Sequence, residues 1–250
     1  MSVIIPAKDE AGSIGNLISR TKATLDKYRF EIIVVDDGSG DNTKDIAQKN
    51  GAVTISHASS LGKGAAMKSG ALAATGDILV FLDGDGAHNP ENIPNVIAPV
   101  LQNRVDLIIG SRDFRGSRTF GSYLPRRVTN KLASFATSVI ISFLLPLVTW
   151  FRCPVKWIGI EDAECGFKAI SKDRWRELDL VSQGFEVETE IIYESAKNRL
   201  IIYNVPISCN WSCKISRLSI IRDGFRTLKL LSGKLIADMG GKRGNFPKPR

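Results

Sequence analysis

The sequence predicts an α/β fold in which a mostly parallel sheet is flanked by helices. Residues 78–82 are apolar without alternation, which is typical of a parallel strand that is covered on both faces. Strand-like and helix-like apolar spacing alternate from residue 2 to residue 111. The apolar run ends in Asp83-Gly84-Asp85, and such sheets bind ligands outside the carboxyl ends of their strands. We therefore expect the functional site at that edge of the sheet.

The first half of the chain supplies these elements in order. Apolar runs predict strands at residues 2–5, 31–35, 52–56, 78–82 and 107–109. Apolar residues at helical spacing predict helices at residues 14–25, 43–50, 64–74 and 90–101. Gly51 is expected to close the second helix, and Asn89-Pro90 to begin the fourth. Residues 1–111 are thus predicted to form one nucleotide-binding half.

Asp83 and Asp85 offer two hard oxygen ligands with a glycine between them. This chemistry suits Mg²⁺ or Mn²⁺ shared with substrate phosphates, because these ions bind through one or two carboxylates. The alternative is a plain surface turn, since Asp-Gly-Asp is also good turn chemistry. Residues 6–10 replace the glycine-rich loop of dinucleotide-binding proteins, so no dinucleotide cofactor is expected. Lys63 lacks the spacing of a phosphate loop.

The net charge of +8 is concentrated at the C-terminus. Residues 214–250 hold ten Lys and Arg against two Asp, so the rest of the chain is neutral. Residues 214–239 are basic and amphipathic, which suits an anionic membrane or nucleic acid. Residues 240–250 have the composition of a flexible tail.

Cysteine usage and the N-terminus indicate a cytoplasmic protein. The four cysteines lack paired C-x-x-C spacing and are expected to be reduced thiols. No charged segment followed by an apolar segment opens the chain, so nothing directs it to secretion.

The motifs of the first half resemble those of family-two glycosyltransferases, which have the Rossmann-like GT-A fold. The resemblance rests on five motifs in order, at residues 6–10, 34–39, 62–64, 83–85 and 110–112. Residues 162–168 and 184–188 resemble dolichyl-phosphate hexosyltransferases, namely dolichyl-phosphate β-glucosyltransferase and dolichol-phosphate mannosyltransferase. This resemblance extends from about residue 2 to residue 230.

The resemblance implies roles for individual residues. The nucleoside of a nucleotide sugar, UDP-glucose or GDP-mannose, would be held by Pro6, Lys8, Glu10 and Asp37. The ribose, diphosphate and metal would meet Asp83, Gly84 and Asp85, with Asp83 and Asp85 as metal ligands, and Lys63 would also bind the substrate. Arg217 would either contact the diphosphate or belong to the membrane-facing basic face. Mannosyl members often have a glutamine metal ligand where this chain has Ala87, which leaves water, phosphate or His88 to complete the shell.

Residues 112–213 are predicted to form the acceptor-binding half. Arg112 with Arg126 or Arg127 would bind the phosphate of a polyprenyl phosphate, and a structural salt bridge is the alternative for Arg112. Asp162 is either a general base or a residue that orders the acceptor loop. A phosphate acceptor needs no strong base, because its second pKa of about 6 makes it an anion at neutral pH.

Residues 132–151 carry no charge over twenty positions, a length that could span a bilayer. A span would separate Arg112 from Asp162, so we expect two interfacial helices broken at Pro146. A buried helical pair is the alternative.

We therefore expect an inverting enzyme that transfers glucose or mannose to a polyprenyl phosphate. It would sit peripherally on the cytoplasmic face of the membrane and bind no nucleic acid. Two alternatives remain: a glycosyltransferase with a hydroxyl acceptor on a glycan or protein, and a non-catalytic membrane or nucleic-acid binding protein.

Overall fold

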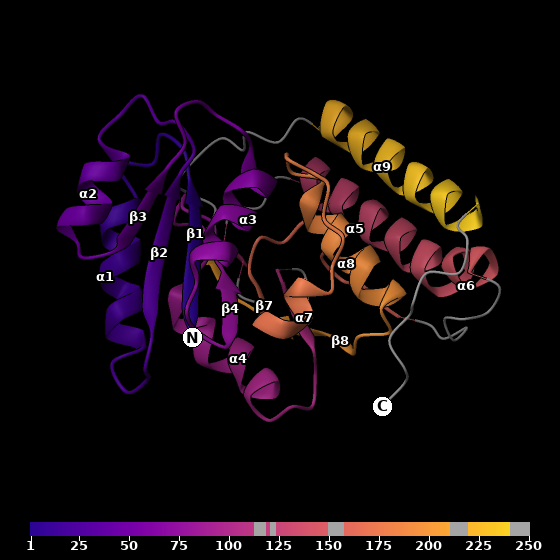
Figure 1. Cartoon of the computed structure of the whole chain (residues 1–250), viewed down its shortest axis with the longest axis horizontal. Helices are drawn as coiled ribbons and strands as arrows, with labels where there is room; N and C mark the ends of the chain where they lie inside the picture. The colour runs from indigo at the N-terminus through magenta and orange to yellow at the C-terminus, as the bar shows by residue number, and fades with distance from the viewer. Residues whose placement is uncertain (113–118, 121–123, 150–157, 211–219, 241–250) are drawn as a thin grey trace.

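The computed structural model describes residues 1–112, 119–120, 124–149, 158–210 and 220–240. Within these ranges a mostly parallel seven-stranded sheet is flanked by helices, which confirms the predicted α/β fold (Figure 1). The strands follow the order β3-β2-β1-β4-β7-β5-β8, and β7 is antiparallel to both of its neighbours. The strands of this sheet are β1 (Ser2–Ala7), β2 (Glu31–Asp36), β3 (Val53–Ser56), β4 (Ile78–Phe81), β5 (Leu107–Ser111), β7 (Lys168–Ser171) and β8 (Ile202–Pro206).

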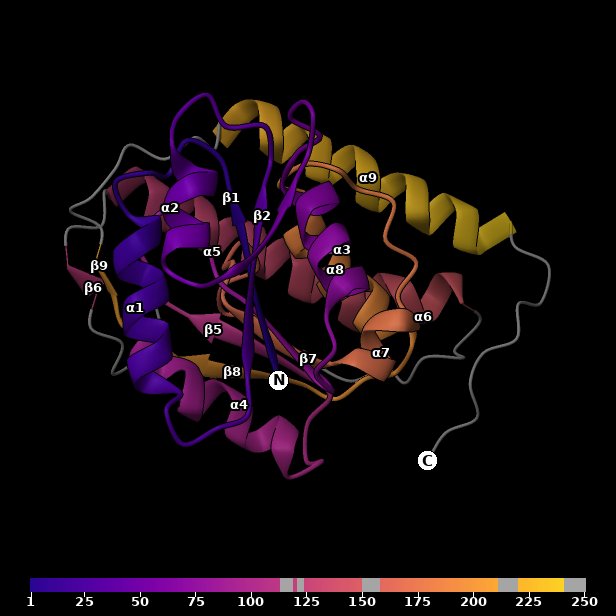
Figure 2. The same ribbon diagram turned by 60° about the vertical axis from the view of Figure 1, so that its left-hand side comes forward.

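Helices of both halves of the chain pack around this sheet (Figure 2). In the first half, α3 contacts β1 and β2, and α4 contacts β4, β5 and β7. The helices of the first half are α1 (Ile14–Thr24), α2 (Thr43–Lys49), α3 (Lys63–Ala73), the 3₁₀ turn η1 (Pro90–Asn92) and α4 (Ile93–Leu101). Those of the second half are α5 (Leu124–Val139), the π-helical turn η2 (Ile140–Leu144), α6 (Leu145–Val148), α7 (Lys172–Arg176), α8 (Val187–Lys197) and α9 (Ile220–Gly240). A separate pair joins β6 (Thr119–Phe120) to β9 (Cys209–Asn210).

The central strands are buried on both faces, as their unbroken apolar sequence predicts. All four residues of β4 are buried, and so are all five of β5. The two predicted halves share this one sheet, because β7 of the second half lies between β4 and β5. The expected boundary at residue 111 therefore falls at the end of β5, within one continuous core.

The helical run from Leu124 to Val148 differs from the expected break at Pro146. Pro146 stands in the first turn of α6, where a helix does not use the missing N–H. The regular α-helical hydrogen bonding is instead interrupted before the proline, at the π-helical turn η2. A wider turn just before the proline relieves the clash that its ring would make with the carbonyl four residues back. The expected pair of helices is thus one helical run with a π turn in it.

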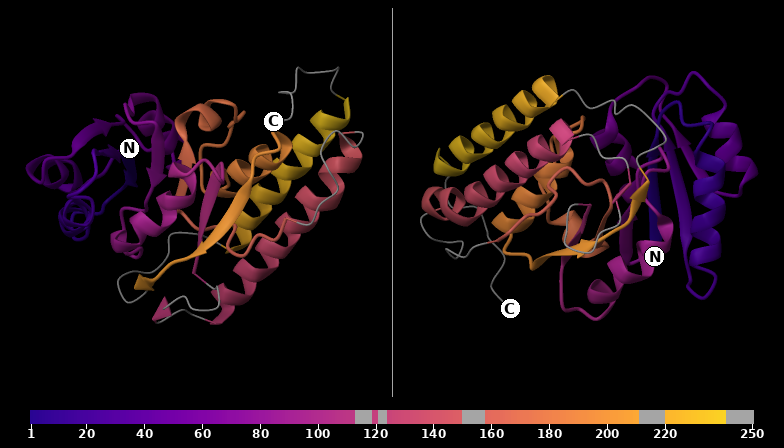
Figure 3. Two further views of the ribbon diagram at one scale, coloured as in Figure 1. Left: turned by 90° about the horizontal axis from the view of Figure 1, so that it is seen from below. Right: turned by 180° about the vertical axis from the view of Figure 1, so that it is seen from behind.

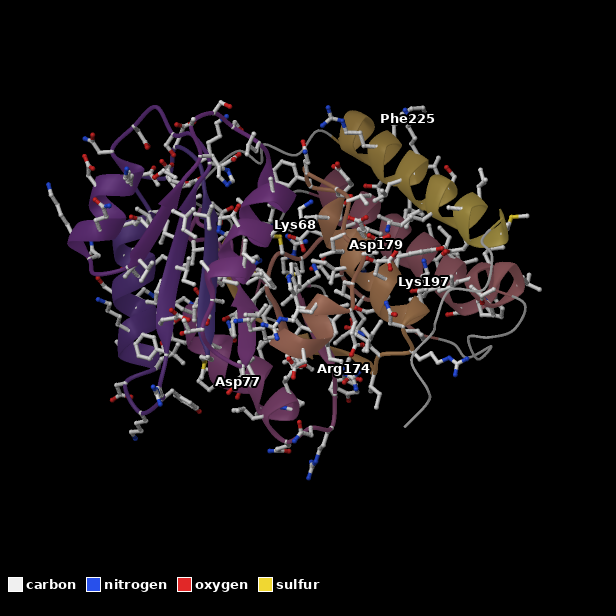
Figure 4. All side chains as sticks on the ribbon, viewed as in Figure 1. Lys68, Asp77, Arg174, Asp179, Lys197 and Phe225 are labelled. Carbon is white, nitrogen blue, oxygen red and sulfur yellow. The ribbon has the colours of Figure 1, made fainter. Side chains whose placement is uncertain are left out.

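The C-terminal helix α9 runs beside α5 and α8 (Figure 3). It covers residues 220–239 of the predicted basic amphipathic segment 214–239 and the first residue of the predicted tail 240–250, while residues 214–219 and 241–250 lie outside the described residues. Phe225 is 70% exposed and lies on the outer side of α9 (Figure 4).

Candidate active site

The carboxyl ends of β1, β2 and β4 meet at one edge of the sheet. Ala7 pairs with Asp36 across β1 and β2, and the Leu82 amide donates to the Ile4 carbonyl at 3.0 Å. A Cβ atom on Gly84 would lie 3.1 Å from the Pro6 carbonyl oxygen, a tight contact that glycine avoids. The structure thus brings the 6–10 and 83–85 motifs together, as parallel strands require.

The turn after β1 is tied to the loop after β2 by backbone-to-side-chain hydrogen bonds. The Asp9 amide donates to Ser39 Oγ at 2.9 Å, and the Glu10 amide donates to Thr43 Oγ1 at 2.7 Å. Asp9 has a φ of 50°, a left-handed conformation in which Asp is more tolerated than most residues. Lys8 and Glu10 are therefore held at this edge, where the nucleoside is predicted to bind.

Asp37 is buried and holds the loop that precedes α3. Its carboxylate accepts hydrogen bonds from Ser60 Oγ at 2.8 Å, Leu61 N at 2.8 Å and Gly62 N at 2.9 Å, and Oδ1 lies 2.7 Å from His57 Nδ1. Burial opposes the charged form, but these partners, His57 foremost, lower the pKa of Asp37 below its usual value. Asp37 therefore fixes the 57–62 loop, and a direct contact with a nucleobase stays a prediction.

Lys63 links the Asp83-Gly84-Asp85 motif to α8. Its ammonium Nζ lies 2.5 Å from Asp83 Oδ1 and 2.7 Å from Glu188 Oε1, and Glu188 also pairs with Lys168 of β7. Burial works against these charges, yet the carboxylates raise the pKa of Lys63 and Lys63 lowers that of Asp83. A Cβ on Gly166 would lie 2.3 Å from Asp83 Oδ1, so that glycine makes room for the carboxylate.

The donor atoms around Asp83 and Asp85 fit a hard divalent cation that is shared with substrate phosphates. His88 Nδ1 is buried, finds no hydrogen-bond partner among the described residues and lies 3.9 Å from Asp83 Oδ2. Burial lowers the pKa of His88, which favours the neutral imidazole that a metal needs. Among the described residues no three His, Cys, Asp or Glu side chains form a metal cluster. The protein would therefore supply part of a shell, as is usual for Mg²⁺.

Cys165 lies beside His88 but does not form a nucleophilic pair with it. Its Sγ is 3.8 Å from His88 Nε2. Burial, with Asp162 nearby, raises the pKa of the Cys165 thiol to about 12. The thiol therefore stays protonated at neutral pH. Cys209 is also a free, buried thiol, whereas Cys153 and Cys213 lie outside the described residues.

Arg112 and Asp162 form a buried bidentate ion pair. Arg112 Nε lies 2.5 Å from Asp162 Oδ2, Arg112 Nη2 lies 2.7 Å from Oδ1, and Asn130 Nδ2 of α5 donates to the same Oδ1 at 2.8 Å. Burial opposes both charges, but Arg112 lowers the pKa of Asp162, and Asp162 raises that of Arg112. The contacts correspond to the salt-bridge alternative for Arg112, while its contact with an acceptor phosphate stays a prediction.

The remaining predicted residues are described only in part. Arg126 and Arg127 lie in the first turn of α5, but their side chains are outside the described residues, as is the whole of Arg217. Sequence reasoning missed the contribution of His57 and Asn130, which have no local motif. Glu188 belongs to the recognised motif at 184–188, so the signal for it was present but unused.

Comparison with known proteins places the chain among glycosyltransferases. The model of the family described as Glycosyl transferase family 2 matches residues 2–164. The chain is 28% identical to the UDP-N-acetylglucosamine–dolichyl-phosphate N-acetylglucosaminyltransferase of Methanococcus voltae, over 94% of this chain and 97% of the relative. It is 29% identical to the dolichol-phosphate mannosyltransferase of Pyrococcus furiosus over 80% of this chain, and it spans about half, 54%, of that relative.

Solved structures agree on the fold. Glucosyl-3-phosphoglycerate synthase from Mycobacterium tuberculosis, in complex with Mn²⁺, UDP and glucosyl-3-phosphoglycerate, superposes with a TM-score of 0.68. The identity is 23%, and the match covers 97% of this chain and 80% of the other. At this identity the likeness supports the GT-A fold alone.

Proposed function

The chain belongs to glycosyl transferase family 2, and on that premise we propose that it transfers a hexose from a nucleotide diphosphate sugar to a polyprenyl phosphate, with inversion at the anomeric carbon. Two relatives are named for transfer to dolichyl phosphate or dolichol phosphate, and one of them matches nearly the whole chain. This supports a lipid phosphate as the acceptor class.

The hydrogen bonding, burial and pKa of Asp162 are the observations that favour one class of acceptor over the other. Both of its oxygens are bound by Arg112 and Asn130, it is fully buried, and its pKa is lowered. A carboxylate in that state is a poor general base, because it is already engaged and holds a proton weakly. A hydroxyl acceptor must lose a proton during attack, whereas a phosphate monoester is already an anion at neutral pH. The absence of a poised base at Asp162 therefore favours the phosphate.

On the donor side, charged residues would stabilise the departing diphosphate and residues at the strand edge would position the nucleoside. Asp83 and Asp85 would hold a Mg²⁺ or Mn²⁺ ion, which when bound neutralises charge on the departing diphosphate. Lys63 is a buried cation beside the same carboxylates, available to the diphosphate if it exchanges Asp83 for a phosphate oxygen. Pro6, Lys8 and Glu10 stand at the strand edge where the nucleoside would bind.

We also propose that the protein lies peripherally on the cytoplasmic face of a membrane, through α5, η2 and α6. Within this run, Asn130–Leu147 is long and apolar enough to cross a membrane, although nearly half of the segment is buried inside the protein. The polarity of the run is inverted: the large apolar side chains that face outward are Leu132, Phe135, Phe143, Leu144 and Leu147. An exposed apolar surface of this kind marks a binding surface, and beside a basic C-terminal segment it suits anionic lipid.

The transferase assignment is tested with a panel of labelled UDP- and GDP-hexoses, each offered with a polyprenyl phosphate, with a soluble hydroxyl acceptor, or alone. We expect metal-dependent transfer to the polyprenyl phosphate with one donor. Transfer only to the hydroxyl acceptor would refute the phosphate-acceptor assignment.

The membrane assignment is tested separately by co-sedimentation with anionic and neutral vesicles. Equal partitioning with and without vesicles at low salt would refute it.

A further inference from the structure

The segment 158–163, which carries Asp162, is held by side chains rather than by a neighbouring strand. On one side it faces the helical run α5–η2. The Ile158 amide donates to Ser142 Oγ at 2.9 Å, the Ile160 amide to Ser138 Oγ at 2.8 Å and the Ala163 amide to Ser134 Oγ at 2.9 Å. All three serines are buried. Three backbone donors of this segment therefore depend on three hydroxyls of one helix.

On its other side the same segment is bound by one residue of β8. Asn204 Nδ2 donates to the Gly159 carbonyl at 2.7 Å, and the Glu161 amide donates to Asn204 Oδ1 at 3.3 Å. From Ile158 to Glu161, successive residues thus bind partners on opposite sides, as in an extended strand, and Ala163 then returns to the helix side. The segment behaves as an added strand whose partners are side chains.

The spacing of the serines matches the spacing of the segment at its first two contacts. Ser134, Ser138 and Ser142 recur every four residues, which is about 6.0 Å along a helix. Two residues of an extended chain cover about 6.6 Å, so Ser142 and Ser138 can bind the amides of Ile158 and Ile160 in a segment that runs antiparallel to the helix. The next contact, from the Ala163 amide to Ser134, comes three residues after Ile160, where the segment is no longer regularly extended. Asn130, four residues before Ser134, continues the row and binds the Asp162 carboxylate at 2.8 Å.

This row also explains why α5 is polar on its buried side. A helix buried against a protein usually turns apolar residues inward. Here the inner side carries Asn130 and the serine row because the unpaired backbone of 158–163 must be satisfied.

We propose that Ser134, Ser138 and Ser142 are positioning residues for the acceptor side of the site. They fix the register of 158–163 and thereby set the Asp162 carboxylate against Arg112. The proposal rests on the proposed function only in naming Arg112 and Asp162 as the acceptor side. It adds residues that neither a motif nor a direct contact with Arg112 would identify.

The test compares Ser138→Ala with Thr137→Val in the full chain. Thr137 is the matched control, because it is a buried hydroxyl of the same helix whose hydrogen bond goes to its own helix, at the Ala133 carbonyl. Hydrogen exchange of the Ile160 amide is measured first. We expect it to be about tenfold faster in Ser138→Ala and unchanged in Thr137→Val, since one hydrogen bond is lost locally. In Ser134→Ala, which removes the next hydroxyl of the row, the Ala163 amide should exchange faster instead.

Kinetics then separate positioning from general destabilisation. In Ser138→Ala the KM for polyprenyl phosphate should rise about tenfold per folded molecule, while the Kd for UDP with Mn²⁺ stays within about twofold. Unchanged exchange at Ile160, equal effects in Thr137→Val, or an equal loss of UDP affinity would each overturn the proposal. Exchange and UDP binding need no acceptor, so a wild-type protein that fails to use polyprenyl phosphate would refute the proposed function while the exchange result still decides on the serine row.

Discussion

Lys63 Nζ lies 2.5 Å from Asp83 Oδ1, so the lysine of one motif neutralises the first carboxylate of another. The two residues come from the start of α3 and the end of β4, and Glu188 of α8 holds the lysine from the other side at 2.7 Å. A ligand that brings a divalent cation and a sugar diphosphate adds positive and negative charges that balance each other in this arrangement. Such a ligand lets Lys63 exchange carboxylate for phosphate without leaving a buried charge unpaired.

The first prediction concerns the metal at Asp85. Asp85→Asn should abolish metal-dependent binding of UDP while leaving the melting temperature nearly unchanged, because Asp85 is half-buried and accepts a local hydrogen bond from the Ala87 amide, which an asparagine oxygen can also accept. Calorimetry of UDP binding with Mn²⁺ and with EDTA makes the comparison. Glu91→Gln, which affects an exposed pair with Arg20, is the control. Wild-type UDP affinity that is the same in EDTA would contradict the metal assignment.

The second prediction concerns the pH dependence that Asp37 confers. Its folded pKa lies below the usual 3.8, so its ionised form stabilises the fold. That stabilisation is complete above about pH 4, the unfolded pKa, and is lost as the pH falls through the folded pKa. Asp37→Asn should therefore lower the free energy of unfolding at pH 7, and the gap to wild type should narrow below about pH 4. Urea unfolding at several pH values measures it; a gap that widens on acidification would contradict the assignment.

The third prediction concerns the contact between α8 and α9. Lys234 Nζ lies 2.7 Å from Glu194 Oε1 and 3.1 Å from Glu190 Oε1, and it donates to the Asp179 carbonyl at 2.7 Å. Burial opposes its charge, but the two carboxylates raise the pKa of Lys234. Lys234→Met would remove the nearest cation from two buried carboxylates, leaving Glu194 with Lys197 at 4.0 Å and Glu190 with the amides of Val181 and Ser182, and should cost about 3–5 kcal/mol of unfolding free energy.

The control for Lys234 is another ion pair between the same two helices. Asp238→Asn weakens the contact of α9 with Lys197, at 2.7 Å, while Lys234 keeps its partners. Urea unfolding should show a much smaller loss for this variant. Figure 4 labels Lys197, which pairs with Asp238, and Asp179, whose carbonyl accepts a hydrogen bond from Lys234. Equal losses for both variants would contradict a special role for Lys234.

Local sequence patterns were sufficient for the strands and for part of the site. Apolar runs predicted β1, β2, β4 and β5, because strands buried on both faces carry mostly apolar residues. The direction of the parallel strands predicted a site at their carboxyl ends, and Pro6 and Gly84 do meet there. These inferences need only the order of elements along the chain.

The partners of the charged residues could not be predicted in this way. Glu188 reaches Lys63, and Asn130 reaches Asp162, from elements distant in sequence whose packing no local spacing specifies. The π turn before Pro146 likewise depends on how α5 and α6 pack together. The uncharged run at 132–151 predicted a helix, but it did not predict that serines would be buried while Leu132 and Phe135 are exposed. Serine carries no charge, so the row of serines did not stand out in an uncharged run.

The last prediction concerns Asp162 and decides between the two classes of acceptor. Asp162→Asn keeps the shape of the side chain but removes the carboxylate charge that pairs with the buried Arg112 guanidinium, so it should lower the free energy of unfolding by about 3–5 kcal/mol. If the acceptor is a phosphate, no proton leaves during attack, and turnover per folded molecule should stay within about tenfold of wild type. If the acceptor is a hydroxyl and Asp162 its base, that turnover should fall by about two to four orders of magnitude.

Arg112→Ala completes this test, because an anionic acceptor depends on the guanidinium more than an alcohol does. Turnover of both variants is measured with saturating donor and polyprenyl phosphate, and the folded fraction is taken from near-ultraviolet circular dichroism. Asn130→Ala is the control, since it removes one hydrogen bond to Asp162 and leaves the pair with Arg112 in place. We expect a larger loss of turnover for Arg112→Ala than for Asp162→Asn. A collapse in folded Asp162→Asn beside near-normal Arg112→Ala would show that Asp162 is a base and that the acceptor is not a phosphate.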